Sequence, residues 1–280
     1  MKLFRKLIAV LFLIPISLLC VAQVKVMTYN IRFNNPNDGD NWWENRKGEV
    51  VQLLDYYSPE IIGIQEGLHS QVEYIDKKMP NYNYVGVGRD DGIKKGEYTA
   101  VYFDTTQIIL VKTKTFWLSE TPDKVSIGWD ASMERISTYA IFRIKKTGEV
   151  LHVFNCHYDH IGELARVNSS QLIMNKIKEF KLDEEKVIVM GDFNSGPDSE
   201  PIQILKKQMD DGAKISLKPL YGPHGTFNSF GKNITPIRRI DYIFTKKLQV
   251  KRYRHIDDKR INGLWFSDHL PVMAEIILDD

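Results

Sequence analysis

Cysteine is scarce in this chain of 280 residues, which contains only Cys20 and Cys156. Cys20 lies in an N-terminal segment that we expect to be removed, so the mature chain keeps one cysteine and forms no intramolecular disulfide. Hydrophobic residues make up 43% of the sequence. A buried core must therefore supply the stability of the fold, and a disordered chain is excluded.

A long apolar run is also missing, which argues against a membrane span. The N-terminal apolar stretch at residues 7–19 is short and is interrupted by Pro15. It follows three basic residues and precedes small residues at the −3 and −1 positions of a cleavage site after Ala22. This pattern predicts a secretory signal peptide over residues 1–22 and an exported protein, periplasmic or secreted, with lipid anchoring through Cys20 as the alternative.

An excess of positive charge is absent once this leader is set aside. The leader holds three of the 38 Lys and Arg residues and none of the 36 Asp and Glu residues, so the mature chain has 35 against 36, a net charge of −1. A global preference for nucleic acid is therefore not predicted, although a local groove for it stays open. No linker, repeat or low-complexity tract divides residues 23–280, so we expect a single domain and a monomer.

The hydrophobic patterns predict a mixture of helices and strands. A capping box from Asn41 to Glu44 predicts a helix over 41–57, and a further helix is expected over 163–181, where apolar residues share one face. Two shorter helices are expected at 68–78 and 199–207. Strands are expected at 24–30, 61–64, 82–87, 99–103, 107–117, 137–144, 150–156, 186–191, 239–245, 248–254 and 271–277. This order indicates an α+β fold of packed sheets with helices outside.

Polar side chains stand at strand termini where an apolar pattern would simply stop. One such end is Gly-Asp-Phe-Asn at 191–194, in which two polar residues, two positions apart, lie on the same side of an extended chain. Six termini carry residues of this kind: Asn30; Glu66; His157, Asp159 and His160; Asp192 and Asn194; Asp241; Asp268 and His269. One or two polar strand ends are ordinary, but six point to a site held by the sheet.

The residue types are those of hard-cation chemistry. Carboxylate and amide oxygens suit Mg²⁺, with Mn²⁺ or Ca²⁺ as alternatives, and the lack of a cysteine cluster or a His-Glu-x-x-His motif argues against zinc. Glu66 and Asp268 would suffice as ligands, with Asn30 nearby. Histidines beside such a cation suit phosphoester hydrolysis. Each asparagine alone also fits a turn, and Asp241 needs a partner, either His269 or one of the adjacent arginines.

The ordered motifs resemble the endonuclease/exonuclease/phosphatase superfamily, which includes DNase I-like nucleases. They are Met-Thr-Tyr-Asn-Ile-Arg, Ile-Gln-Glu, Asn-Cys-His-Tyr-Asp-His, Gly-Asp-Phe-Asn, Arg-Ile-Asp-Tyr-Ile-Phe and Ser-Asp-His-Leu-Pro, and they span residues 24–278. The resemblance implies a four-layer α/β/β/α sandwich with two mainly antiparallel sheets. It implies an enzyme rather than a non-catalytic interaction module, because no position of the core pattern is missing.

The resemblance also implies a role for each residue. Glu66 would be the principal metal ligand, with Asn30 and Asp268 close to the metal or its waters. Asp192 would orient or deprotonate the attacking water, and Asn194 would hold the phosphate. His269, oriented by Asp241, would stabilise the charge of the phosphate, and His157 would be a second phosphate contact or a general acid.

Substrate contacts are expected from a second group of residues. Arg89 lies within the glycine-rich stretch 86–92, which is not a dinucleotide fingerprint because its third glycine is one position late, and the Arg89 guanidinium suits phosphate. The remaining candidates are Tyr98, Arg135, Asp159, His160 and Phe227. A core position for Tyr98, an acidic partner for Arg135 and a packing role for Phe227 stay open as alternatives. We therefore expect an exported, divalent-metal-dependent phosphoesterase that uses in-line attack of water. The substrate class stays open, because the enzyme could be a nuclease for DNA or RNA, a sphingomyelinase or an inositol-phosphatase-like enzyme.

Overall fold

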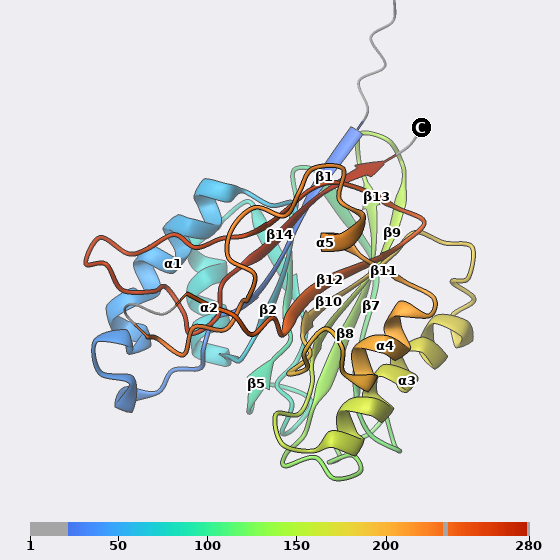
Figure 1. The fold of residues 1–280 in the computed structure, drawn as a ribbon, viewed down its shortest axis with the longest axis horizontal. Coiled ribbons are helices and arrows are strands. Elements are labelled where there is room, and N and C mark those ends of the chain that lie inside the picture. The colour runs from blue at the N-terminus through green and yellow to red at the C-terminus, as the bar shows by residue number, and fades with distance from the viewer. Residues whose placement is uncertain (1–21, 232–234, 279–280) are drawn as a thin grey trace, which may run out of the picture.

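Two six-stranded sheets form the centre of the molecule (Figure 1). The computed structural model describes residues 22–231 and 235–278. The first sheet has the order β13-β14-β1-β2-β6-β4 and the second the order β11-β12-β10-β9-β8-β7, while β3 and β5 form a small separate pair. All neighbours in the two sheets are antiparallel except β1 with β2 and β9 with β10. The predicted α+β class is confirmed.

The strands of the first sheet are β1 (Ala22–Asn30), β2 (Ile61–Gln65), β4 (Tyr82–Val85), β6 (Val101–Asp104), β13 (Gln249–His255) and β14 (Val272–Leu278). Those of the second are β7 (Ile108–Trp117), β8 (Ile136–Ile144), β9 (Val150–His157), β10 (Val187–Asp192), β11 (Asp210–Asp211) and β12 (Asp241–Lys246). The small pair consists of β3 (Gly67–Leu68) and β5 (Glu97–Tyr98). The shortest strands, β3, β5 and β11, were not predicted, because two residues are too few for a pattern.

Helices cover the outer face of each sheet. On one side are α1 (Trp43–Tyr57) and α2 (His69–Lys78), and on the other are α3 (Glu163–Glu179) and α4 (Glu200–Lys206), as Figure 1 shows. Three apolar cores follow from this order. One lies between the sheets, one between the first sheet and α1 with α2, and one between the second sheet and α3 with α4. The implied four-layer α/β/β/α sandwich is therefore confirmed.

Each sheet contains one parallel strand pair joined by a helix, β1-α1-β2 in the first and β9-α3-β10 in the second. Parallel neighbours end at the same edge, so Asn30 pairs with Gln65 and His157 pairs with Asp192. The antiparallel strands β12 and β14 begin at this edge, and Asp241 pairs with Asp192. This topology brings together the polar strand termini that the sequence separates.

A buried amide bridge joins the two sheets just behind this edge. Gln65 Nε2 donates to Asn155 Oδ1 at 2.6 Å, and Asn155 Nδ2 donates to the carbonyl oxygens of Ile64 and Ala100, both at 3.0 Å. A Cβ atom on Gly63 would lie 2.7 Å from Asn155 Oδ1, so only glycine fits there. Because both amides are fully buried, these bonds hold β2 and β9 in a set register.

The predicted capping box at Asn41 is wrong. Asn41 ends a 3₁₀ helix, η1 (Pro36–Asn41), and α1 begins two residues later with Trp42 as an N-cap whose side chain makes no capping hydrogen bond to the helix. Arg46 Nε donates to the Asn41 carbonyl at 2.8 Å and Arg46 Nη1 donates to that of Ile31 at 2.7 Å. A buried arginine from inside α1 thus binds the preceding chain, which a capping pattern does not reveal.

The predicted signal peptide lies outside the described residues except for Ala22, which is the first residue of β1 and pairs with Leu278. Among the residues that the structure describes, no helix has the length and apolar character needed to cross a membrane.

His255 at the end of β13 makes folding stability depend on pH. Its ring is fully buried, Nδ1 donates to the Pro223 carbonyl at 2.7 Å, and burial lowers its pKa from 6.5 to about 4. Below pH 6.5 the unfolded chain therefore binds a proton at His255, whereas the folded chain does not bind it until the pH approaches 4. We predict that this residue destabilises the fold as the pH falls from 6.5 to 4, by up to about 3 kcal/mol.

Urea unfolding at pH 7 and at pH 4.5 measures this effect. His255→Asn keeps an N–H donor for the Pro223 carbonyl and removes the titration, so its stability should fall less between the two pH values. An equal loss in the variant and the parent would contradict the assignment.

Candidate active site

A cavity of about 530 Å³ opens at the edge where the strand termini meet. Of the predicted residues, those that line it are Glu66, Arg89, Arg135, His157, His160, Asp192, Asn194, Phe227, Asp268 and His269. Asn30, Asp159 and Asp241 are buried and bond to lining residues. Tyr98 is absent from the lining and packs in the core.

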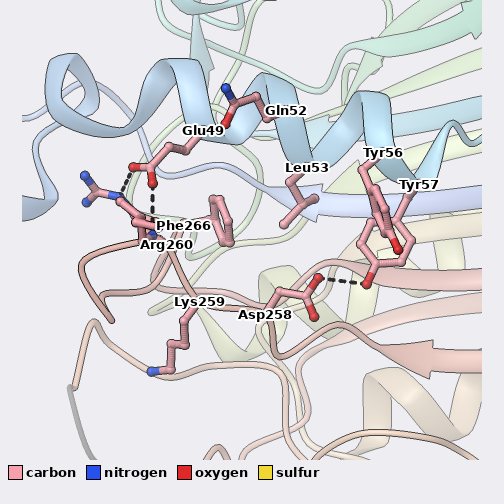
Figure 2. Close-up of a pocket in the computed structure, with 10 residues that line it drawn as sticks. Glu49, Gln52, Leu53, Tyr56, Tyr57, Asp258, Lys259, Arg260 and Phe266 are labelled. Atoms are coloured by element: carbon pink, nitrogen blue, oxygen red, sulfur yellow. Dashed lines mark hydrogen bonds and ion pairs between the residues drawn. The ribbon is translucent and has the colours of Figure 1, made fainter.

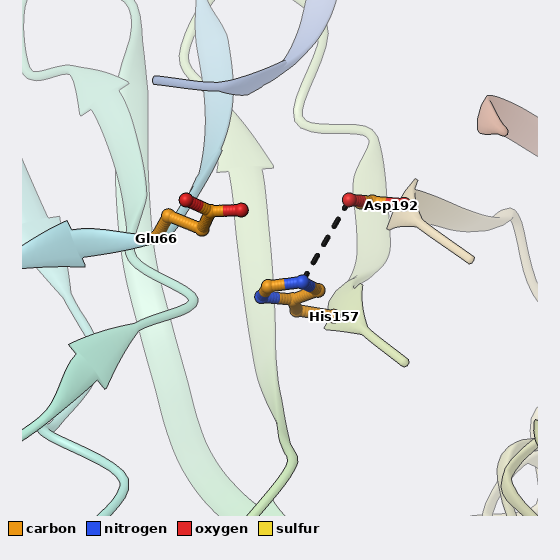
Figure 3. A group of neighbouring side chains, drawn as sticks. All are labelled: Glu66, His157 and Asp192. Carbon is orange, nitrogen blue, oxygen red and sulfur yellow. Dashed lines mark ion pairs between the residues drawn. The ribbon is translucent and has the colours of Figure 1, made fainter. Parts of the chain in front are cut away.

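Asp192 lies at the centre of the site. Its Oδ2 accepts from Asn30 Nδ2 at 3.0 Å, and its Oδ1 accepts from the backbone N–H of Asn194 at 2.9 Å. The Nε2 atoms of His157 and His269 each lie 3.7 Å from Oδ2, and Figure 3 shows the His157 contact. Burial raises the pKa of Asp192 to about 7. The carboxylate can therefore accept a proton near neutral pH.

His269 is held by Asp241. The imidazole Nδ1 lies 2.9 Å from Asp241 Oδ2 and donates to this carboxylate. Burial alone would lower the pKa of His269, but the charges of Asp241 and Asp192 raise it well above its ordinary value. Of the two expected partners for Asp241, the structure thus selects the histidine, while Arg239 turns away and binds Asp211 at 2.6 Å. The protonated form of His269 is therefore favoured.

His157 has the opposite character. Arg135 Nη1 lies 3.0 Å from its Nε2, and Glu97 Oε2 lies 3.7 Å from its Nδ1. Burial, reinforced by the positive charges of Arg135 and Arg89, lowers the pKa of His157 well below 6.5. One neutral and one protonated imidazole therefore flank the same oxygen of Asp192.

The carboxylates at the cavity fit a hard cation. Glu66 Oε1 accepts from Asn30 Nδ2 at 2.9 Å, and Glu66, His157 and Asp192 each offer a ligand atom within 4.8 Å of the others. Burial raises the pKa of Asp268, and the nearby charge of Glu66 raises it further. Crowded buried acids of this kind are stabilised by a divalent cation. Asn30 turns its amide nitrogen toward both acids, so here it positions them.

Backbone strain marks the same edge. Glu66 and Asn194 both have left-handed backbones, with φ of 63° and 47°. A non-glycine residue pays about 1–3 kcal/mol for such a conformation, which persists only where the surroundings enforce it. At both positions the turn directs a polar side chain of a strand end into the cavity.

Asp159 and His160 act around Arg135. Asp159 Oδ2 accepts from Arg135 Nε at 3.2 Å, while its Oδ1 accepts from the backbone N–H groups of Ile161 and Gly162. Burial opposes ionisation of Asp159, but these backbone bonds outweigh it and lower its pKa to about 2. His160 Nδ1 lies 2.8 Å from Arg135 Nη2. Asp159 thus orients Arg135 from behind the cavity.

Of the two positions expected for Tyr98, the pocket lining and the core, the structure shows the core. Its hydroxyl donates to the Ile93 carbonyl at 3.0 Å, and its ring stacks on His69. Because successive residues of β5 face opposite sides, the adjacent Glu97 faces the cavity instead. Glu97 binds Arg89 through both carboxylate oxygens, at 2.6 and 3.0 Å, and burial together with the charge of Glu66 raises its pKa to about 7.

Sequence reasoning missed three charged residues of the lining: Arg32, Glu97 and Arg238. Arg32 follows Asn30 within one motif and lies 3.9 Å from Glu66 Oε2 and 4.0 Å from Asp268 Oδ2. The alternation of β5 is the signal that would have favoured Glu97 over its neighbour.

A second cavity, of about 630 Å³, lies between α1 and the segment around residues 258–266 (Figure 2). Its acids are paired: Glu49 Oε2 binds Arg260 at 2.6 Å, and Asp258 accepts from the Tyr57 hydroxyl at 2.8 Å. None of the predicted site residues lines it, so the smaller cavity is the candidate active site.

Comparison with known proteins agrees with this geometry. Residues 27–269 match the model of the Endonuclease/Exonuclease/phosphatase family. The chain belongs to this family. A family member of known structure from Bacteroides vulgatus is 36% identical, with a TM-score of 0.86 over 92% of this chain and 100% of that one. The family consists of phosphoesterases, and this chain is one of them.

Two further relatives are similar along most of their length. A mannosyl-6-phosphatase from Bacteroides thetaiotaomicron is 35% identical, with a TM-score of 0.86 over 91% of this chain and 100% of that one. An uncharacterized protein of Acanthamoeba polyphaga mimivirus is 28% identical over 82% of this chain and 91% of its own length.

The pairing of Asp241 with His269 generates a prediction for this phosphoesterase. Asp241→Asn removes the charge that stabilises the imidazolium, so the pKa of His269 should fall and kcat should drop roughly 10²- to 10⁴-fold. NMR titration of the histidines and steady-state kinetics measure the two effects. The exposed Asp257, changed to Asn, is the control, and an unchanged His269 titration in Asp241→Asn would refute the pairing.

Proposed function

We propose that this family member is an exported, divalent-metal-dependent phosphomonoesterase that acts on a sugar phosphate. The observation that carries the proposal is the position of Asp192, whose Oδ2 lies between a neutral and a protonated histidine beside the acids of a cation site. An acceptor for a water proton and a donor for a charged oxygen stand next to each other, as attack of water on a phosphoester requires.

The residues of the cavity have separate roles in the proposed reaction. Asp192 accepts the proton of the attacking water, and His269 donates to the phosphate oxygens through the charge that Asp241 maintains. Asn194 donates one amide N–H to the Tyr158 carbonyl at 3.0 Å, which leaves the other for phosphate. His157 serves as a phosphate contact rather than a general acid, because burial and two arginines disfavour its protonated form.

A divalent cation, Mg²⁺ first among the candidates, would be held by Glu66 and Asp268 with Asn30 orienting the acids. It would polarise a phosphoryl oxygen and offset the charge of the substrate. The donor set of the described residues is rich in oxygen, which favours a hard cation over zinc.

The lining of the cavity favours a small substrate. It contains four arginines, at positions 32, 89, 135 and 238, and four carboxylates, at positions 66, 97, 192 and 268, so the acids match the arginines in number. A groove that tracks a nucleic-acid backbone would instead be strongly positive. A sphingomyelinase would be expected to expose an apolar hairpin beside the cavity, but Trp117, the last residue of β7, is buried and donates to the Arg89 carbonyl. The similarity to a mannosyl-6-phosphatase supports a sugar phosphate.

A substrate panel with Mg²⁺ tests the proposal. We expect hydrolysis of hexose 6-phosphates to exceed that of DNA, RNA, sphingomyelin and phosphoinositides, and EDTA to abolish it. Asp192→Ala should lower kcat at least roughly 10³-fold because it removes the proton acceptor, whereas Asp183→Ala, in the turn between α3 and β10, should not. Full activity in EDTA, or in Asp192→Ala, would overturn the corresponding role, and activity on nucleic acid alone would overturn the substrate class.

Export is tested by the mass of the protein recovered from the cells that make it. A chain cleaved after Ala22 starts at Gln23 and retains the rest of β1. We expect this mass in the periplasmic or extracellular fraction. An intact chain in the cytosol would contradict export, and an acylated chain starting at Cys20 would favour the lipid anchor.

A further inference from the structure

Three of the four cavity arginines are already bound to acidic side chains. Arg32 Nε lies 3.1 Å from Asp38, and Arg89 forms its double contact with Glu97. Arg135 is held by Asp159 and lies against two histidines. These guanidinium groups already use much of their hydrogen-bonding capacity within the protein. The neighbouring acids also offset their positive charge, so each guanidinium attracts an anionic ligand only weakly.

Arg238 differs from the other three. No carboxylate among the described residues forms an ion pair with it, and its side chain is exposed at the cavity. Its guanidinium carbon lies 5.4 Å from the centre of the Phe227 ring, a cation–π distance. The Phe227 ring in turn packs edge-on against His269, with 5.0 Å between the ring centres. The Phe227 ring therefore lies between Arg238 and His269 and contacts both.

The backbone fixes which way Arg238 points. The N–H groups of Thr226 and Phe227 both donate to its carbonyl, at 2.8 and 3.1 Å. In the extended chain before β12, Arg238 and Ile240 face the cavity, whereas Arg239 faces inward to Asp211. Two consecutive arginines thus have opposite environments, one neutralised in the core and one presented to the substrate.

We propose that Arg238 is a specificity-determining residue that binds the non-bridging oxygens of the substrate phosphate and selects phosphomonoesters over phosphodiesters. The proposal rests on the proposed function. A phosphomonoester carries about −1.5 to −2 charges at pH 7, against −1 for a diester. An arginine fork binds phosphate oxygens in pairs, and Arg238 has no ion pair within residues 22–231 and 235–278 to break before it does so.

The test compares two esters with the same leaving group, p-nitrophenyl phosphate and methyl p-nitrophenyl phosphate, in the Mg²⁺-loaded protein. Arg238→Gln should lower kcat/KM for the monoester roughly 10- to 100-fold, mostly through KM, and should lower that for the diester several-fold less. Arg238→Lys keeps the charge and should recover much of the loss. Arg143→Gln, at an exposed position near the β8–β9 turn, is the matched control.

Binding of inorganic phosphate, measured by calorimetry, gives a readout that needs no turnover. Arg238→Gln should weaken it by the same factor as the monoester KM, and Arg143→Gln should leave it unchanged. Equal losses for both esters, or unchanged phosphate binding, would overturn the role of Arg238. If the parent protein hydrolyses neither these two esters nor a hexose 6-phosphate, the proposed function fails, and phosphate binding alone then decides whether Arg238 recognises phosphate.

Discussion

The buried amide bridge between Gln65 and Asn155 is the constraint on which the site depends. Each sheet supplies only half of the catalytic groups: β1 and β2 carry Asn30 and lead into Glu66, whereas β9 and β10 end in His157 and Asp192. Two apolar faces can slide over each other at little expense, because hydrophobic contact has no direction. Directed hydrogen bonds between fully buried amides prevent that slippage. Asn30 Nδ2 can then reach Asp192 Oδ2 across the interface at 3.0 Å.

Charge compensation is the second organising feature of the site. Arginines, acids and histidines alternate around the cavity, and most of them satisfy one another before any ligand arrives. This arrangement keeps buried charges tolerable without a large positive field. It also separates the two histidines chemically, since the charges of Asp241 and Asp192 raise the pKa of His269, whereas burial and the charges of Arg135 and Arg89 lower that of His157. A family with one fold can therefore change substrate by altering which charges are left uncompensated.

Much of the fold and of the core site could be predicted from the sequence, for a physical reason. A polar residue that closes an apolar strand is anomalous, and parallel and antiparallel pairing collects such residues at one edge. The direction in which side chains point from short segments could not be predicted. Glu97 and Tyr98 form a strand of two residues, and Arg238 precedes its strand, so neither has a periodic pattern to show which side faces the cavity. On α3, Leu164 is 53% exposed whereas Ser169 and Ser170 are buried, so the buried face of this helix is not the apolar face that its sequence predicts.

The pairing of β1 with β14 has a consequence for the order of assembly. These strands come from opposite ends of the domain, yet they are neighbours in the first sheet along their whole length. While a ribosome is still making the intervening residues, β1 has an open flank that β14 will later occupy. Sheet closure is a late, long-range event, and such topologies fold slowly. If the chain is exported, it would therefore stay unfolded enough to pass through a translocon until β14 has been synthesised.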